Sequence, residues 1–306
     1  MFESKQKTLK KIVNFAGTGL HLGKKVSINL KPAEADTGII FKRTDIKNNN
    51  EIKANYNNVS SAKLCTKLEN DHGVSVSTIE HLMAALYICG VDNLIVQIDG
   101  GEIPIMDGSS IEFVEKIKKT GLKTLDKNRK FIKIIKKIDL KLQDKSIFIE
   151  PSADSLKVAF TLSYENSPLI KSQTNCVDFK NKNLENIYSA RTFCLYEDIE
   201  KVKSLGLAKG GNLDNAVVVK GDKVLNETGL RSKNEFVNHK ILDLAGDFML
   251  AGMRIIGSVS CMHGGHLLTN EFLKKILSNK DNFVITESLE NISNLKKITP
   301  NQKRIA

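Results

Sequence analysis

The chain has 306 residues, 41% hydrophobic and 26% charged, a balance that predicts a globular protein with a core and excludes wholesale disorder. No apolar run is long enough to cross a bilayer, and the first residues lack the apolar stretch of a secretory signal, so we expect a cytoplasmic protein. Its five cysteines include no C-x-x-C pair, which fits free thiols in a reducing compartment.

The formal net charge of +11 is carried mainly by lysine and is densest at 116–145 and 296–304. Two interpretations stay open: a solvated surface, or attraction to an anionic substrate or an acidic membrane surface. A basic RNA-binding protein is a further alternative. However, aromatic residues make up only 6% and tryptophan is absent, so no base-stacking surface is visible and we expect no nucleic-acid partner.

In the first half, the alternation at 26–30 and 38–41 predicts strands. A helix is predicted to start just before Thr78 and to end at Gly90, followed by a strand at 93–98. A second helix is predicted over Ser110 to Lys119. The polar, lysine-rich segment 120–130 is interpreted as a linker between two domains.

The second half repeats this plan. A long helix is predicted from Asn234 to Ala251, ended by Gly252 and followed by a strand at 254–259. Strands are also predicted at 131–136, 138–142, 146–149 and 156–164. The fold class is therefore α+β, with two similar domains, each a layer of helix on sheet.

The predicted boundaries place an N-terminal domain at 1–123 and a C-terminal domain at 131–290, followed by a basic tail at 291–306. Two segments interrupt the regular pattern, at 59–73 and 195–221. The second contains an amphipathic stretch with Ile199, Val202 and Leu205 on one side. Inserts of this kind are natural walls for a site.

Two of the six histidines lie in predicted helices beside acidic residues. His239 and Asp243 are four residues apart, so both point from one helix face and can reach a single metal ion. Glu80 and His81 are adjacent in the other helix, an arrangement in which the histidine binds a metal and the glutamate reaches its water. Taken alone, His239 and Asp243 also fit a hydrogen-bonded helical pair, and Glu80 and His81 also fit a helix-capping glutamate beside a packed histidine. Together, His81, His239 and Asp243 give three ligands with an open position, the composition of a catalytic zinc site.

Several longer motifs occur in order along nearly the whole chain, and through them it resembles the UDP-3-O-acyl-N-acetylglucosamine deacetylases of lipid A synthesis. The motifs are Gly17-Thr18-Gly19-Leu20-His21, Thr78-Ile79-Glu80-His81-Leu82, Glu102-Ile103-Pro104-Ile105-Met106-Asp107-Gly108-Ser109, Ala190-Arg191-Thr192-Phe193, Gly229-Leu230-Arg231, Asn234-Glu235-Phe236-Val237-Asn238-His239-Lys240, Asp243-Leu244-Ala245-Gly246-Asp247 and Gly265-His266.

The resemblance implies zinc-dependent hydrolysis of the acetamide of a UDP-linked 3-O-acyl-N-acetylglucosamine, with release of acetate, as the committed step of lipid A synthesis. Zinc, with ferrous iron as the alternative, would be bound by His81, His239 and Asp243. Glu80 would act as general base on the zinc-bound water. His266 would be cationic and would stabilise the oxyanion of the tetrahedral intermediate. A zinc amidohydrolase acting on another nucleotide sugar stays open as an alternative.

The remaining roles come from the same resemblance. Asp247 would orient His266 and favour its protonated form, and Thr192 would donate its hydroxyl to the oxyanion. The substrate would be a small UDP-sugar lipid. Separately, we expect a monomer whose lysine-rich surface touches the inner-membrane surface transiently. The positions implied for substrate binding are Lys240, Phe193 and Tyr164 at the nucleotide-sugar end, and Leu20, Ile199 and Ala208 along the acyl chain.

The chain departs from the family pattern at a few positions. His263 replaces a frequent lysine before the Gly-His pair, which puts one diphosphate contact in doubt. Ser163 and Ser167 occupy positions near the uracil pocket that are often acidic and histidine. Cys65 lies in the first insert, where the family can have a thiol near the metal, and we assign it no catalytic role.

Overall fold

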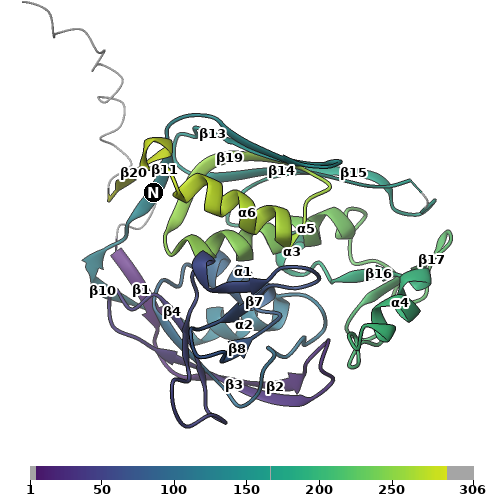
Figure 1. Cartoon of the computed structure of the whole chain (residues 1–306), viewed down its shortest axis with the longest axis horizontal. Coiled ribbons are helices and arrows are strands. Elements are labelled where there is room, and N and C mark those ends of the chain that lie inside the picture. Colours follow the sequence, from purple (N-terminus) through teal and green to yellow (C-terminus); the bar gives the residue numbers. More distant parts are fainter. Residues whose placement is uncertain (1–4, 166, 288–306) are drawn as a thin grey trace, which may run out of the picture.

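The computed structural model describes residues 5–165 and 167–287. It is a mixed α and β protein, as the sequence predicts, built in layers (Figure 1). Two sheets form the outside, and the helices lie between them. Within the described ranges, no helix combines the length and apolar character needed to cross a membrane. The basic tail predicted at 291–306 lies outside the described residues.

One outer sheet comes from the first half of the chain and has the order β2–β3–β9–β4–β5. Its strands alternate between buried and accessible side chains; in β3, Val26, Ile28 and Leu30 point into the core. The alternation predicted at 26–30 and 38–41 is therefore confirmed. The bounds are β2 Val13–Thr18, β3 Lys25–Pro32, β4 Ile39–Arg43, β5 Glu51–Lys53 and β9 Leu94–Ile98.

The other outer sheet comes from the second half and is centred on the long strand β19. Its path is β12–β13–β19–β11–β20, and β14 also pairs with β19 and carries β15 at its free edge. The strands predicted in this half are confirmed to within a few residues. The bounds are β11 Phe131–Ile134, β12 Ile138–Leu142, β13 Lys145–Glu150, β14 Leu156–Tyr164, β15 Lys171–Asp178, β19 Arg254–Met262 and β20 Phe283–Thr286.

The helices between the sheets meet at the centre of the molecule, where α1 packs against α5 (Figure 1). Both are buried almost all round. In α5 every residue except Lys240 is buried, and in α1 only Ile88 and Cys89 at its end are partly exposed. A helix buried on every side belongs to the core of a protein. The bounds are α1 Glu80–Cys89, α2 Ile111–Thr120, α3 Glu185–Tyr188, α5 Glu235–Phe248 with the 3₁₀ turn Met249–Ala251, and α6 His266–Leu277.

The two inserts form small sheets of their own. The first, 59–73, supplies β6 Val59–Ser61 and β7 Lys67–Glu69, and β7 also pairs with β8 Ser75–Val76 just after the insert. The second, 195–221, supplies β17 Val217–Lys220, which lies between β16 Phe193–Leu195 and β18 Lys223–Val224. The amphipathic stretch of the second insert becomes the short helix α4, Ile199–Ser204. It has no buried residue, and Leu205 beyond its end is 55% exposed, so it contributes little to the core.

Two sequence-based expectations were wrong in detail. The segment interpreted as a linker forms the strand β10, Leu122–Asn128, which pairs with β1, Lys5–Leu9. Only Leu125 of β10 is buried, which explains why its composition is that of a loop. The helix α1 begins at Glu80 rather than before Thr78, because Thr78 has φ of +57° and its hydroxyl donates to Glu102 instead of capping the helix.

Candidate metal centre and active site

The predicted metal ligands come together at the crossing of α1 and α5. His81 lies in the first turn of α1, and His239 and Asp243 lie one turn apart on α5. Asp243 Oδ1 is 3.6 Å from His81 Nε2 and 3.4 Å from His239 Nε2. One ligand atom from each residue lies within 4.8 Å of the others, and all three side chains are buried. The two imidazole rings meet edge to face at 5.0 Å.

The chemistry of these groups fits a divalent cation. Burial and the neighbouring His239 lower the pKa of His81 to about 3, and burial also lowers the pKa of His239, so both imidazoles are neutral. Burial disfavours the charged Asp243, but the neighbouring cations Lys240 and His266 outweigh it and hold the pKa of Asp243 well below its usual range. Its Oδ1 is buried and accepts no hydrogen bond from the described residues. A bound cation would satisfy this oxygen, and neutral imidazole and ionised carboxylate are the ligand forms.

A backbone contact on the side of the ring away from Asp243 fixes the orientation of His239. Its Nδ1 lies 3.0 Å from the carbonyl oxygen of Ala190, which can only accept, so Nδ1 carries the proton. The lone pair of Nε2 then faces Asp243 and the metal position. Metal-binding histidines are commonly oriented by an acceptor on the second nitrogen in this way.

Glu80, His266 and Asp247 form an acidic and basic group beside these ligands. His266 opens α6, and its Nδ1 lies 2.8 Å from Asp247 Oδ2. Its Nε2 is 3.7 Å from Glu80 Oε1 and 3.9 Å from Asp243 Oδ2. Thr66 joins the group from the first insert, because its N–H donates to Glu80 Oε2 at 3.0 Å and its hydroxyl to Asp247 Oδ1 at 2.6 Å.

The environment raises the pKa values of both Glu80 and His266 above their ordinary values. Burial raises the pKa of Glu80 to about 7, against the opposing pull of His266. Burial would lower the pKa of His266, but Asp247 and then Glu80 overcome it and raise the pKa to about 10. A carboxyl group that titrates near neutral pH beside a stably protonated imidazole is suited to acid–base chemistry.

The positions predicted to bind the nucleotide sugar lie on one side of the metal ligands. The ring of Phe193 is 6.0 Å from that of Tyr164 and 6.3 Å from that of His239. Lys240 Nζ lies 5.7 Å from the centre of the Phe193 ring and 2.9 Å from Asp243 Oδ2. Thr192, beside Phe193, is anchored through its backbone, with its N–H donating to Gly108 O at 2.7 Å.

The positions predicted for the acyl chain involve two loops that touch. The carbonyl oxygen of Leu20 accepts from the N–H of Gly210 at 3.0 Å, and that of Ala208 accepts from Gly211 at 3.2 Å. These contacts bring Leu20 and Ala208 to the same place. Ile199 is half-buried at the start of α4.

The structure also shows where the residues lie that depart from the family pattern. His263 has φ of +53° in the turn before α6, Ser163 lies in β14, and Ser167 is buried. Burial and the charge of Glu80 raise the pKa of Cys65 to about 12, so its sulfur stays a protonated thiol.

Sequence reasoning missed the parts of the site that belong to the backbone or to the inserts. The Ala190 carbonyl has no side-chain signature, and Thr66 lies in a segment whose fold the pattern does not reveal. The sequence also indicates no role for His21, the last residue of the motif Gly17-Thr18-Gly19-Leu20-His21. It is buried, its Nδ1 has no hydrogen-bond partner among the described residues, and it lies near enough to His266 for the charges to interact.

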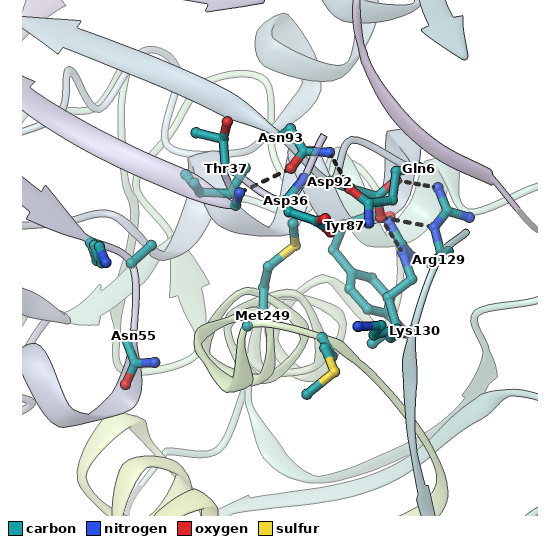
Figure 2. A pocket seen from close by; sticks show the side chains of 17 residues that line it. Gln6, Asp36, Thr37, Asn55, Tyr87, Asp92, Asn93, Arg129, Lys130 and Met249 are labelled. Carbon is teal, nitrogen blue, oxygen red and sulfur yellow. Dashed lines mark hydrogen bonds and ion pairs between the residues drawn. The ribbon is translucent and has the colours of Figure 1, made fainter. Parts of the chain in front are cut away.

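A separate cavity of about 270 Å³ lies near the C-terminal ends of α1 and α5, away from the candidate metal ligands (Figure 2). Its lining includes Tyr87, seven residues and so about 10 Å along α1 from Glu80. Its polar groups are largely paired: Arg129 donates to Asp92 at 2.8 and 2.6 Å, and Asn93 accepts from Gly38. None of the predicted site residues lines it, so we assign the chemistry to the metal centre.

Comparisons with known proteins agree with this geometry. A family model described as UDP-3-O-acyl N-acetylglycosamine deacetylase matches residues 6–278. Proteins named UDP-3-O-acyl-N-acetylglucosamine deacetylase are similar over most of their length. The one from Glaesserella parasuis is 41% identical over 90% of this chain and 91% of its own. The one from Geobacter sp. strain M21 is 43% identical over 92% of each. The one from Wigglesworthia glossinidia is 42% identical over 94% of this chain and 98% of its own. The chain therefore belongs to the UDP-3-O-acyl-N-acetylglucosamine deacetylase family.

Proposed function

We propose that this chain hydrolyses the acetamide of a UDP-linked 3-O-acyl-N-acetylglucosamine and releases acetate, the committed step of lipid A synthesis, with zinc bound by His81, His239 and Asp243. The observation that carries the proposal is the meeting of these three ligands with Glu80 and His266. Family membership supplies the substrate class. A zinc ion held there would act as a Lewis acid on the amide carbonyl and would lower the pKa of a water molecule.

Glu80 is the general base in this proposal. It accepts a proton from the attacking water as the water oxygen bonds to the amide carbon. Its carboxylate is held by the N–H of Thr66 on one oxygen, which leaves the other, 3.7 Å from His266 Nε2, facing the reaction space. When the C–N bond breaks, a proton must reach the departing amine, and the acetyl group leaves as acetate.

His266 supplies positive charge where the amide oxygen becomes negative. Asp247 accepts from Nδ1 and leaves the proton on Nε2 directed toward the site. The same proton can pass to the leaving amine. Thr192 would add a hydroxyl donor to the oxyanion, and one donor of this kind typically contributes ~2.7–4 kcal/mol to lowering the barrier.

Substrate recognition is assigned to the two sides of the metal centre. Tyr164, Phe193 and Lys240 would hold the nucleotide sugar, with the rings stacking and the ammonium group binding an oxygen. Leu20, Ile199 and Ala208 would line the passage for the acyl chain. The contact between the Leu20 and Ala208 loops supports this assignment.

The wider arrangement belongs to the same proposal. The chain would consist of two similar α+β domains at 1–123 and 131–290, with the active site between them. It would act as a cytoplasmic monomer that touches the inner-membrane surface transiently. The packing of α1 from one half against α5 from the other supports a site at the junction.

The deciding experiment measures metal content together with acetate release from the UDP-linked acyl sugar. Reconstitution of the metal-free protein with zinc and with ferrous iron identifies the active metal. Glu80→Ala should keep bound zinc and lose most turnover, whereas His239→Ala should lose metal affinity. Near-normal turnover in Glu80→Ala would remove the base assignment. Activity confined to another UDP-sugar would favour the related amidohydrolase instead.

A further inference from the structure

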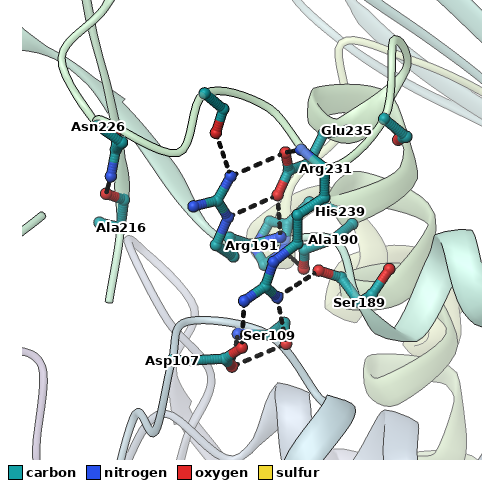
Figure 3. A network of polar contacts seen from close by, with 12 residues as sticks. Asp107, Ser109, Ser189, Ala190, Arg191, Ala216, Asn226, Arg231, Glu235 and His239 are labelled. Carbon is teal, nitrogen blue, oxygen red and sulfur yellow. Dashed lines mark hydrogen bonds and ion pairs between the residues drawn. The ribbon is translucent and has the colours of Figure 1, made fainter. Parts of the chain in front are cut away.

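The motif that ends in Asp107-Gly108-Ser109 has no part in the chemistry above, yet it touches both halves of the site (Figure 3). Asp107 Oδ1 accepts from the N–H and the hydroxyl of Ser109 at 3.0 and 2.8 Å, which closes a tight turn. Gly108 in this turn has φ of +87°, and a Cβ atom there would overlap the carbonyl oxygen of Asn215. The turn is therefore rigid and closely fitted to its neighbours.

Arg231 ties this turn to the segment behind His239. One guanidinium nitrogen donates to Asp107 Oδ2 at 2.7 Å, and the other donates to Ser189 O at 2.8 Å and reaches Ser109 Oγ at 3.3 Å (Figure 3). The Arg231 side chain is 36% exposed, and that of Asp107 is 20% exposed. The guanidinium thus bridges two segments more than eighty residues apart in the chain.

The bridged segment, 189–192, supplies two groups to the site. The Ala190 carbonyl accepts from His239 Nδ1, and Thr192 provides the proposed oxyanion donor. Thr192 is also held by the same turn, since its N–H donates to Gly108 O. The position of both groups therefore depends on where the turn holds the segment.

The same turn reaches the helix that carries the other histidine ligand. The hydroxyl of Ser110 donates to the carbonyl oxygen of His81 at 2.7 Å, and the N–H of Ser110 donates to Tyr188 O at 2.9 Å. One short turn is thus bonded both to His81 and to the chain that orients His239.

We propose that Arg231, held by Asp107, is a positioning residue of the metal centre: it fixes the 189–192 segment so that the Ala190 carbonyl holds the His239 tautomer and Thr192 faces the oxyanion. The proposal rests on the proposed function for the metal and the oxyanion. Arg231 itself contacts none of the metal ligands. Its planar guanidinium donates to two acceptors at fixed angles. A lysine ammonium cannot reproduce this geometry, so a positive charge alone would not replace the arginine.

The test compares Arg231→Lys and Asp107→Asn with the wild-type protein. A matched control is Arg43→Lys. Arg43 also pairs with an aspartate, Asp45 at 2.6 Å, and donates to a backbone carbonyl, that of Ser75, but it lies in β4 and contacts none of the proposed site residues. Thermal unfolding of each metal-free variant establishes that it is folded.

Three measurements separate positioning from general stability. Zinc affinity is measured by competition with a chromophoric chelator. The His239 tautomer is followed by ¹⁵N NMR of the metal-free protein. kcat and KM are measured at saturating zinc. We expect both site variants to bind zinc about 10–100-fold more weakly, the size of effect typical when the orienting partner of a metal-binding histidine is disturbed. We also expect loss of the single Nδ1–H form and lower kcat with unchanged KM.

Wild-type zinc affinity and a retained Nδ1–H tautomer in both folded variants would overturn the proposal, as would an equal change in Arg43→Lys. If wild-type protein binds zinc but releases no acetate, the proposed function fails while the affinity and tautomer measurements still test the role of Arg231. Should Arg231→Lys not fold, Asp107→Asn carries the same test, because it weakens the link to the turn while Arg231 can still donate to Ser189.

Discussion

Gly246 of α5 lies directly against the backbone carbonyl of Glu80 at the start of α1, so closely that a Cβ atom on Gly246 would overlap that carbonyl oxygen. The absence of a side chain therefore sets how near the two helices approach. This crossing lies between Asp243 and Asp247 on one helix and beside His81 on the other. The spacing of the metal ligands and of the acid–base pair depends on it.

We predict that Gly246→Ala destabilises the fold and lowers turnover. Insertion of a methyl group into a packed interior typically costs about 1–3 kcal/mol, and here the displaced atoms are the backbone of the catalytic helix. Urea unfolding and acetate-release kinetics check both effects. Gly101→Ala is the control, because its new Cβ meets only ordinary contacts of 3.5 Å and beyond. Unchanged stability and rate in Gly246→Ala would show that the helices separate without cost.

How far the sequence predicts this molecule depends on the kind of information each part requires. His239 and Asp243 could be paired as candidate metal ligands because they share a helix face, a relation fixed by helical geometry alone. That His81 would join them could not follow from spacing, because it depends on how two helices far apart in the chain cross. The composition of the three-residue set suggested it, and the likeness of the motifs supported it.

The misses have equally physical reasons. Strand β10 looks like a linker because it is solvated, and pairing with β1 uses backbone groups that leave no trace in the side chains. Threonine is a common helix-capping residue, but the hydroxyl of Thr78 donates a hydrogen bond to Glu102 instead. The Ala190 carbonyl that orients His239 is likewise a backbone group and has no sequence signal.

A second prediction concerns the buried ion pair of Arg191 and Glu235. Glu235 is fully buried and accepts from Arg191 Nε at 2.8 Å and from the N–H of Arg231 at 2.6 Å (Figure 3). Glu235→Ala leaves the buried guanidinium without its counter-charge, and a loss of this kind typically costs ~3–5 kcal/mol. Urea unfolding should show this loss, whereas Glu69→Ala, which removes a solvent-screened partner of Lys67, should change stability far less. Equal effects would contradict the prediction.

A third prediction concerns the pH dependence of turnover. In the proposed mechanism Glu80 acts in its ionised form and His266 in its protonated form, so kcat/KM should rise as pH increases through the pKa of Glu80, which burial places at about 7. For the same reason kcat/KM should fall as pH increases through the pKa of His266, about 10. A bound dication attracts the carboxylate and repels the imidazolium, and it therefore moves both limbs to lower pH.

The assignment of the two limbs is checked with variants whose residual activity can be followed. Glu80→Gln should remove the acidic limb, and His266→Gln should remove the basic limb. Apparent pKa values belong to the coupled pair, so each variant is also expected to shift the limb that remains. A profile in Glu80→Gln that still rises between acid and neutral pH would assign that limb to another group.

The fourth prediction concerns metal removal. Without a cation, Asp243 Oδ1 is a buried oxygen that accepts no hydrogen bond within the described part of the chain, between two neutral imidazoles. Zinc should therefore bind the folded state far better than the unfolded one. At a free zinc concentration 100-fold above the dissociation constant, this linkage adds about 2.7 kcal/mol to the free energy of unfolding. Chelation followed by titration with zinc, monitored by thermal unfolding, measures this gain.

Two variants serve as controls. His239→Ala removes one candidate ligand and should abolish most of the gain. His72→Ala changes an exposed histidine away from the ligands and should keep the gain. A zinc-dependent gain of equal size in His239→Ala would mean that the ion binds elsewhere, and the three ligands would then have to be assigned another role.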